Sequence, residues 1–140
     1  MVILLDIDGV LVTTPPWRAV ELEADGFLNF IERAANNLVR IVDQTKADIV
    51  LTTTHRINYS IGEWQAFLQT RGIHSPLISK INDVATIGGM DDRAAEIAEW
   101  VSLNVGETYV IIDDDLSIHR LPQAIKARCV LTKPMVGLDE

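Results

Sequence analysis

Short apolar runs alternate along this chain with segments whose apolar residues recur every three or four positions. A run of four to six apolar residues is typical of a buried strand, and the wider spacing is typical of a helix covering a sheet. The predicted strands lie at 2–5, 47–51, 76–81, 109–112 and 129–131. This alternation predicts an α/β protein with a parallel sheet. We expect 140 residues to form one domain, 1–140, around one core.

Helical spacing occurs in three segments between these strands. The first stripe follows start signals at Asp25 and Gly26, and comprises Phe27, Ile31, Ala34, Leu38 and Ile41. The second ends near Gly72 and comprises Ile61, Trp64, Phe67 and Leu68. The third follows Asp91 and Asp92 and comprises Ala94, Ile97, Ala98 and Val101. A further short helix is predicted near 117–125.

Two of the predicted strands run directly into aspartates. Asp6 and Asp8 follow the first apolar run, and the acids at 113–115 follow the fourth. A buried carboxylate without a cation costs several kcal/mol, so folding alone does not explain these acids. In an extended chain Asp6 and Asp8 point to the same side. Because carboxylate oxygens are preferred ligands of Mg²⁺, the two acidic strand ends predict one magnesium site.

Threonines follow the second predicted strand, at 52–54. Ligands of an open parallel sheet bind beyond the carboxyl ends of its strands, where the strand order reverses. If the first, second and fourth strands are neighbours, hydroxyl groups and carboxylates meet there. A hydroxyl can donate to a phosphoryl oxygen, and a carboxylate can attack phosphorus to form an acyl phosphate. These residues therefore predict phosphoryl transfer, with Asp6 as nucleophile and Asp8 as the proton donor and acceptor.

Three segments, LLDIDGVL, IVLTTTH and YVIIDDD, resemble in this order the first, second and fourth motifs of the haloacid dehalogenase-like (HAD) superfamily. The resemblance implies a three-layer Rossmann-like domain with a five-stranded parallel sheet of order 3-2-1-4-5. It also implies that Asp6 is a nucleophile and metal ligand, and that Asp8 is a general acid/base whose backbone carbonyl binds the metal. Dehalogenases of the superfamily lack an acid at the position of Asp8, so this residue favours a phosphatase.

The resemblance extends to the remaining site residues. Asp114 is implied as the direct Mg²⁺ ligand, with Asp113 as its neighbour in or near the coordination sphere of the metal. Asp115 is expected to be a turn residue. Thr52 is implied as a phosphate ligand, with Thr53 as the alternative if the strand register differs by one.

The third HAD motif is a basic residue, usually Lys, near the start of the helix before the fourth strand. Arg93 stands there, and Lys80 and Lys133 are alternatives. Arg56, which follows His55 and the threonines, is a candidate second phosphate ligand. The segments RAAEIAEWV, YVIIDDD and VGLDE are also similar to small HAD proteins associated with RNA-repair modules.

The function predicted first is a Mg²⁺-dependent phosphatase that works through an aspartyl-phosphate on Asp6. One alternative is a HAD-fold phosphate-binding or regulatory protein with weak or no turnover. Another is a receiver-like phosphoacceptor domain, whose motif order disagrees with this chain. The connections leave no room for a sizeable cap domain, so we expect an open site that accepts a phosphate group, including one on a macromolecule.

Charge and cysteine content limit the expected partners. The net charge of −8 argues against an extended nucleic-acid footprint and against anionic membranes. The single cysteine, Cys129, cannot form an internal disulfide. Asp6 and Asp8 interrupt the N-terminal apolar run, unlike a secretory signal, so a cytoplasmic protein is expected. The substrate and the oligomeric state stay open.

Overall fold

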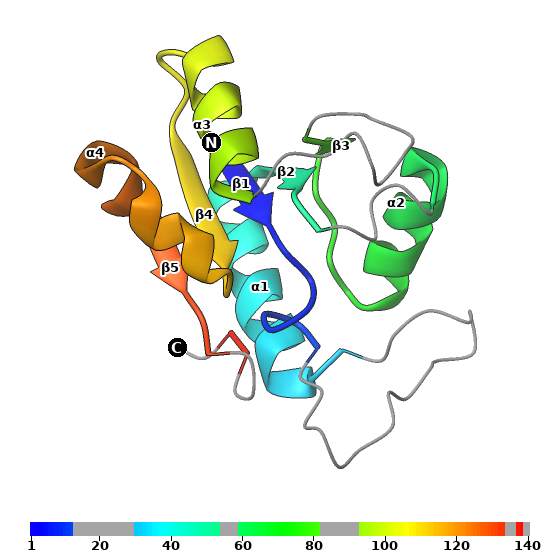
Figure 1. The fold of residues 1–140 in the computed structure, drawn as a ribbon. Coiled ribbons are helices and arrows are strands. Elements are labelled where there is room, and N and C mark those ends of the chain that lie inside the picture. Colours follow the sequence, from blue (N-terminus) through cyan, green and yellow to red (C-terminus); the bar gives the residue numbers. More distant parts are fainter. Residues whose placement is uncertain (13–29, 54–58, 82–92, 134–136, 139–140) are drawn as a thin grey trace.

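The computed structural model describes residues 1–12, 30–53, 59–81, 93–133 and 137–138 (Figure 1). The strands in this part of the chain are β1 (Val2–Leu5), β2 (Asp48–Leu51), β3 (Ile78–Lys80), β4 (Tyr109–Asp113) and β5 (Cys129–Leu131). The helical elements are α1 (Glu32–Thr45), α2 (Ile61–Thr70), α3 (Arg93–Leu103), the 3₁₀ helix η3 (Leu116–Arg120) and α4 (Gln123–Lys126). The strands form one parallel sheet in the order β3-β2-β1-β4-β5, which confirms the predicted fold.

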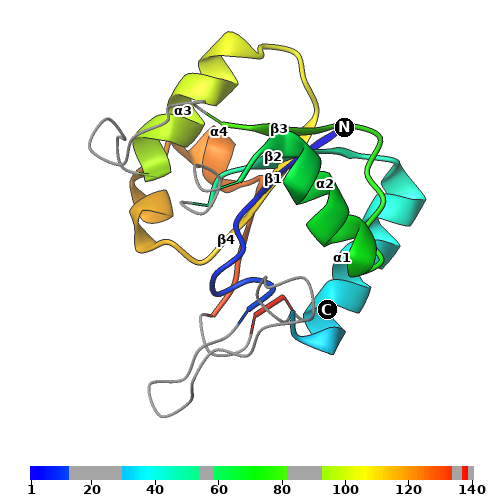
Figure 2. The same cartoon turned by 90° about the vertical axis from the view of Figure 1, so that its right-hand side faces the viewer.

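Helices cover both faces of the sheet, with α1 and α2 on one side and α3 and α4 on the other (Figure 2). Side chains of a strand alternate between its faces, and β1 shows this directly. Ile3 and Leu5 lie in the apolar cluster that includes α1 and α2. Val2 and Leu4 lie in the cluster that includes α3, η3 and α4. Because β1 is buried on both faces, it reads as a continuous apolar run.

Helix α2 has clear local signals at both ends. The Ser60 side chain accepts a hydrogen bond from the Glu63 N–H, and the Glu63 side chain accepts one from the Ser60 N–H, which forms a capping box. The helix ends with Arg71 as C-cap, and Gly72 follows with a φ of +84°. The start signals predicted for the other helices, Asp25 and Gly26 with Phe27, and Asp91 with Asp92, lie outside the described residues.

The helix predicted at 117–125 is wrong as one element. The structure has η3 and α4 instead, separated by Leu121 and Pro122. Proline disfavours the helical conformation in the residue before it, and Leu121 is extended with φ −71° and ψ 153°. Pro122 then serves as the N-cap of α4. Asp114 and Asp115 connect β4 to η3, so η3 lies next to the acidic strand end.

The described ranges include no cap domain over the sheet. None of their helices has both the length and the apolar character that a membrane span requires.

Candidate active site

The site is built on the carboxyl edge of the three central strands. Leu5, the last residue of β1, is paired with the last residue of β2 and with Ile112 of β4. The residues that follow Leu5, Leu51 and Ile112 in the sequence are Asp6, Thr52 and Asp113. Backbone hydrogen bonds continue the ladder, because Asp6 N–H donates to the Ile112 carbonyl at 3.0 Å and Thr52 N–H donates to the Leu5 carbonyl at 2.9 Å. The register therefore sets these three polar residues in one buried row.

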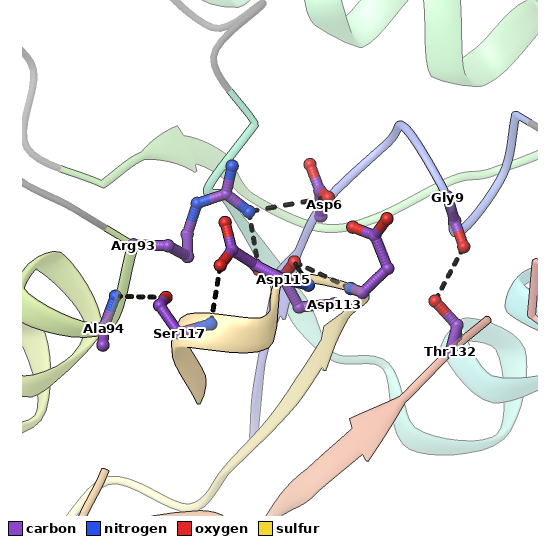
Figure 3. Close-up of polar contacts among 9 residues, drawn as sticks. Asp6, Gly9, Arg93, Ala94, Asp113, Asp115, Ser117 and Thr132 are labelled. Atoms are coloured by element: carbon purple, nitrogen blue, oxygen red, sulfur yellow. Dashed lines mark hydrogen bonds and ion pairs between the residues drawn. The ribbon is translucent and has the colours of Figure 1, made fainter. Parts of the chain in front are cut away.

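Arg93, the first residue of α3, reaches this row from the neighbouring helix (Figure 3). Its Nη1 lies 2.6 Å from Oδ2 of Asp113 and 3.5 Å from Oδ2 of Asp6. Burial lowers the pKa of Arg93, but the Asp6 and Asp113 carboxylates outweigh this and raise it above its ordinary value. The guanidinium thus brings a permanent positive charge to a group of buried acids.

The two lysines considered as alternatives to Arg93 lie elsewhere. Lys80 ends β3, which β2 separates from β1. Lys133 is exposed beyond β5 and forms an isolated bridge with Gly137. Of the three basic residues, Arg93 is the one with an ion pair to the aspartates of the row.

Asp113 is held by protein donors at both of its carboxylate oxygens. Oδ1 accepts hydrogen bonds from the N–H groups of Asp114 at 2.8 Å and Asp115 at 3.0 Å, and Oδ2 accepts from Arg93. Asp114 is less buried than Asp113 and turns its carboxylate toward the loop after β1. This arrangement favours Asp114 and Asp6 over Asp113 as ligands of a cation.

The carboxylates of Asp6, Asp113 and Asp114 each place an oxygen within 4.8 Å of the other two. Burial raises the pKa of Asp6 to about 9, with Arg93 opposing the shift and Asp113 adding to it. Burial also raises the pKa of Asp114. Acids this close cannot all ionise cheaply unless a cation joins them. Their hard oxygen atoms fit Mg²⁺, which takes few protein ligands and keeps several waters.

Gly9 makes room for this group. Its φ is +78°, and a Cβ built on it would collide with the carboxylate of Asp114. Glycine is therefore needed here both for the backbone conformation and for the approach of Asp114. Asp8, the preceding residue, is exposed, and its side chain is not in the three-carboxylate group. The metal contact predicted for its backbone carbonyl stays a prediction.

Two hydroxyl residues that the sequence did not indicate fix the loops of the site (Figure 3). Thr132, directly after β5, donates from Oγ1 to the Gly9 carbonyl at 2.7 Å. Ser117 in η3 accepts at Oγ from the Ala94 N–H at 3.2 Å. The Ser117 N–H in turn donates to Oδ1 of Asp115 at 2.8 Å, so Asp115 is the N-cap of η3, in agreement with the predicted turn role. Thr132 directly follows a strand, whereas Ser117 lies within η3, and no local pattern marks either hydroxyl as part of the site.

The remaining predicted residues divide into two groups. Thr53 is fully buried next to Thr52. Arg56 and His55 lie outside the described residues. The structure therefore brings together Asp6, Asp113, Asp114 and Arg93, with Gly9 and Thr52 beside them. The site roles of Asp8 and Thr53 stay predictions.

Comparison with known proteins agrees with this geometry. No curated protein and no solved structure matches the chain. A family model described as the HAD domain in Swiss Army Knife RNA repair proteins matches residues 2–140, which include every strand of the sheet and every residue of the site. The chain therefore belongs to this family of HAD domains.

Proposed function

We propose that this protein is a Mg²⁺-dependent phosphatase in which Asp6 is the nucleophile. Membership of the HAD superfamily supports phosphohydrolase chemistry in general. The finer assignment depends on one observation: the buried Asp6 carboxylate lies at a strand end together with Asp114 and the guanidinium of Arg93. This combination offers a nucleophile, a cation ligand and a fixed positive charge within one small volume.

Asp6 and Asp114 would hold the metal through their carboxylates, with Asp113 beside them. When bound, Mg²⁺ supplies positive charge that reduces the repulsion between an anionic phosphate and these acids. Asp113 orients Arg93 through the 2.6 Å ion pair, so that the guanidinium is placed beside Asp6. Thr52, adjacent to Asp6 in the row, is the proposed hydroxyl donor to a phosphoryl oxygen, with Thr53 as the alternative.

The reaction has two steps. An oxygen of the Asp6 carboxylate attacks phosphorus, the bond between phosphorus and the leaving oxygen breaks, and the carboxylic acid of Asp8 protonates that oxygen. The carboxylate of Asp8 then accepts a proton from water, whose oxygen attacks phosphorus. Cleavage of the acyl phosphate releases inorganic phosphate and restores the Asp6 carboxylate.

The family description suggests the substrate class. Its members are named as domains of RNA repair proteins, and we propose the terminal phosphate of an RNA as the substrate. The net charge of −8 supports recognition of the end of the strand over a long electrostatic footprint along it. The lack of a cap over the described part of the chain supports access for a substrate of this size.

Hydrolysis of p-nitrophenyl phosphate tests the reaction class. Activity should require Mg²⁺, stop on addition of EDTA, and be lost in Asp6→Asn, which keeps the shape of the side chain but removes its nucleophilic charge. Unchanged activity in Asp6→Asn would exclude the assignment. Oligonucleotides with 3′- or 5′-terminal phosphates, compared with phosphopeptides and phosphorylated metabolites, test the substrate class.

Binding without turnover is the second candidate function. The observation that favours it is the close pairing of Arg93 with Asp113, which engages the guanidinium before any phosphate arrives. Calorimetry with Mg²⁺ and beryllium fluoride separates the two functions, because tight binding of this phosphate analogue without hydrolysis of any panel substrate supports the binding protein. The receiver-like alternative is not supported, since the chain belongs to a HAD family.

A further inference from the structure

We propose that Ser117 is a positioning residue that sets the place of the Arg93 guanidinium for the reaction. The inference rests on the proposed phosphatase function, in which Arg93 lies beside the nucleophile. Ser117 is not proposed to touch Asp6 or the substrate. It acts through the backbone of α3 and through the loop that follows β4.

The hydrogen bonds around Ser117 close a ring (Figure 3). Its Oγ accepts from the Ala94 N–H at 3.2 Å, and its own N–H donates to Asp115 Oδ1 at 2.8 Å. The Asp115 N–H donates to Asp113 Oδ1 at 3.0 Å, and Asp113 Oδ2 accepts from Arg93 at 2.6 Å. Arg93 is covalently joined to Ala94, so the ring returns to its starting point.

Each member of the ring has a physical reason for its place. The first N–H groups of a helix have no partner within the helix, and the Ser117 hydroxyl accepts from one of them at the second residue of α3. The Asp115 cap fixes where η3 begins, and therefore where this hydroxyl lies relative to Asp113. The Asp113 carboxylate therefore positions Arg93 twice: directly through the guanidinium, and through Asp115 and Ser117 at the backbone of the next residue, Ala94.

The ring matters because a long arginine side chain has many rotamers to lose when it is ordered. Its two anchors, one through the backbone at Ala94 and one through the guanidinium at Asp113, reduce the positions open to Nη1. Further along α3, Ile97 is buried in the core, and Ala98 and Val101 pack against the same cluster. Removing the Ser117 hydroxyl should therefore loosen the first turn of α3 and leave the rest of the helix packed.

The first test is kinetic and uses the full chain with p-nitrophenyl phosphate and Mg²⁺. Ser117→Ala should lower kcat/KM about 5- to 10-fold, which corresponds to the loss of one hydrogen bond. Ser117→Thr keeps the hydroxyl and should stay within about twofold of the wild type. Ser102→Ala is the matched control, because Ser102 lies at the other end of α3 and its hydroxyl donates to the Glu99 carbonyl. Equal kcat/KM in Ser117→Ala and the wild type would overturn the proposal.

A double-mutant cycle separates positioning from general destabilisation. If Ser117 acts through Arg93, Ser117→Ala should change kcat/KM by less than about twofold in an Arg93→Ala background. The same 5- to 10-fold loss in both backgrounds would show that Ser117 acts independently of Arg93, and would overturn the proposal.

A readout without turnover distinguishes failure of this inference from failure of the proposed function. The guanidinium resonances of Arg93, followed by NMR in the free protein, should report restricted rotation in the wild type and in Ser102→Ala, and faster averaging in Ser117→Ala. If Ser117→Ala shows faster averaging but the wild type hydrolyses none of the phosphate substrates, the proposed phosphatase function is rejected and the positioning role of Ser117 is retained. Identical Arg93 resonances in Ser117→Ala and the wild type would reject the positioning role.

Discussion

The carboxylate of Asp114 lies in the space that a side chain on Gly9 would need. The loop after β1 and the loop after β4 therefore approach each other with no room for a single additional carbon. The same glycine is also held by Thr132, whose Oγ1 donates a hydrogen bond to the Gly9 carbonyl oxygen at 2.7 Å. The Asp114 carboxylate can therefore take its place in the site only because Gly9 has no side chain.

Gly9→Ala should destabilise the protein and disturb the site together. The φ of +78° costs a non-glycine residue about 1–2 kcal/mol, and the collision with Asp114 adds to that cost. Urea denaturation should show the loss in the free energy of unfolding, and Mg²⁺ titration should show weaker binding.

Gly106→Ala is the matched control for this change. Its φ is +91°, and a Cβ there meets no atom within 4 Å, so this variant experiences the backbone cost alone. If Gly9→Ala had the same free energy of unfolding as Gly106→Ala and bound Mg²⁺ normally, the close approach of Asp114 to Gly9 would contribute nothing to stability or to metal binding.

Arg93→Ala should impair both stability and activity. Its removal leaves the fully buried Asp113 without its cationic partner, which should cost up to about 3 kcal/mol in the free energy of unfolding. Loss of a charge beside the nucleophile should lower kcat about 100-fold. Arg128→Ala provides the control, because Arg128 stacks over Tyr109 near the start of β4, at the other end of the sheet, and its loss should leave kcat unchanged. A kcat for Arg93→Ala within a few-fold of the wild type would contradict the role of this residue.

The metal-free protein should become less stable as the pH rises. Burial raises the pKa of Asp6 from 3.8 to about 9, so the folded state binds more protons than the unfolded state between these values. The free energy of unfolding should then fall by at most about 1.4 kcal/mol per pH unit across this window. Urea denaturation in EDTA from about pH 5 to about pH 8 measures the slope. Asp6→Asn should reduce the slope, and a slope that is the same in both proteins would contradict this explanation.

Mg²⁺ should stabilise the folded state through Asp114. At a concentration about 100 times the dissociation constant, the expected gain in the free energy of unfolding is about 2.7 kcal/mol. Asp114→Asn should lose most of this gain. Asp115→Asn is the control in the same loop, because Asn caps a helix about as well as Asp does and Asp115 caps η3. Equal Mg²⁺ stabilisation in Asp114→Asn and Asp115→Asn would argue against Asp114 as a ligand.

Much of the fold was predictable because its signals are local. Buried parallel strands such as β1 are apolar throughout, and the order of the acidic and threonine strand ends matched the HAD superfamily. Pro122 is a local signal as well, because proline disfavours the helical conformation in the residue before it, and it divides the predicted helix into η3 and α4.

The supporting residues of the site could not be predicted in the same way. Thr132 and Gly9 are 123 positions apart, and their hydrogen bond exists only after β1, β4 and β5 have assembled. Ser117 likewise meets Ala94 across two separate elements. No periodicity or motif in one segment records such contacts, because each depends on the packing of the whole sheet.

In the proposed reaction, Asp6 carries the phosphoryl group during turnover. The most direct measurement is the intact mass of the protein after rapid mixing with p-nitrophenyl phosphate and Mg²⁺, followed by acid quench and peptide mapping. Asp8→Asn, which slows the attack of water, should gain the mass of one phosphoryl group, located on the peptide that contains Asp6. Phosphoryl transfer to another residue, or the same mass gain when Asp6→Asn is added, would contradict this role of Asp6.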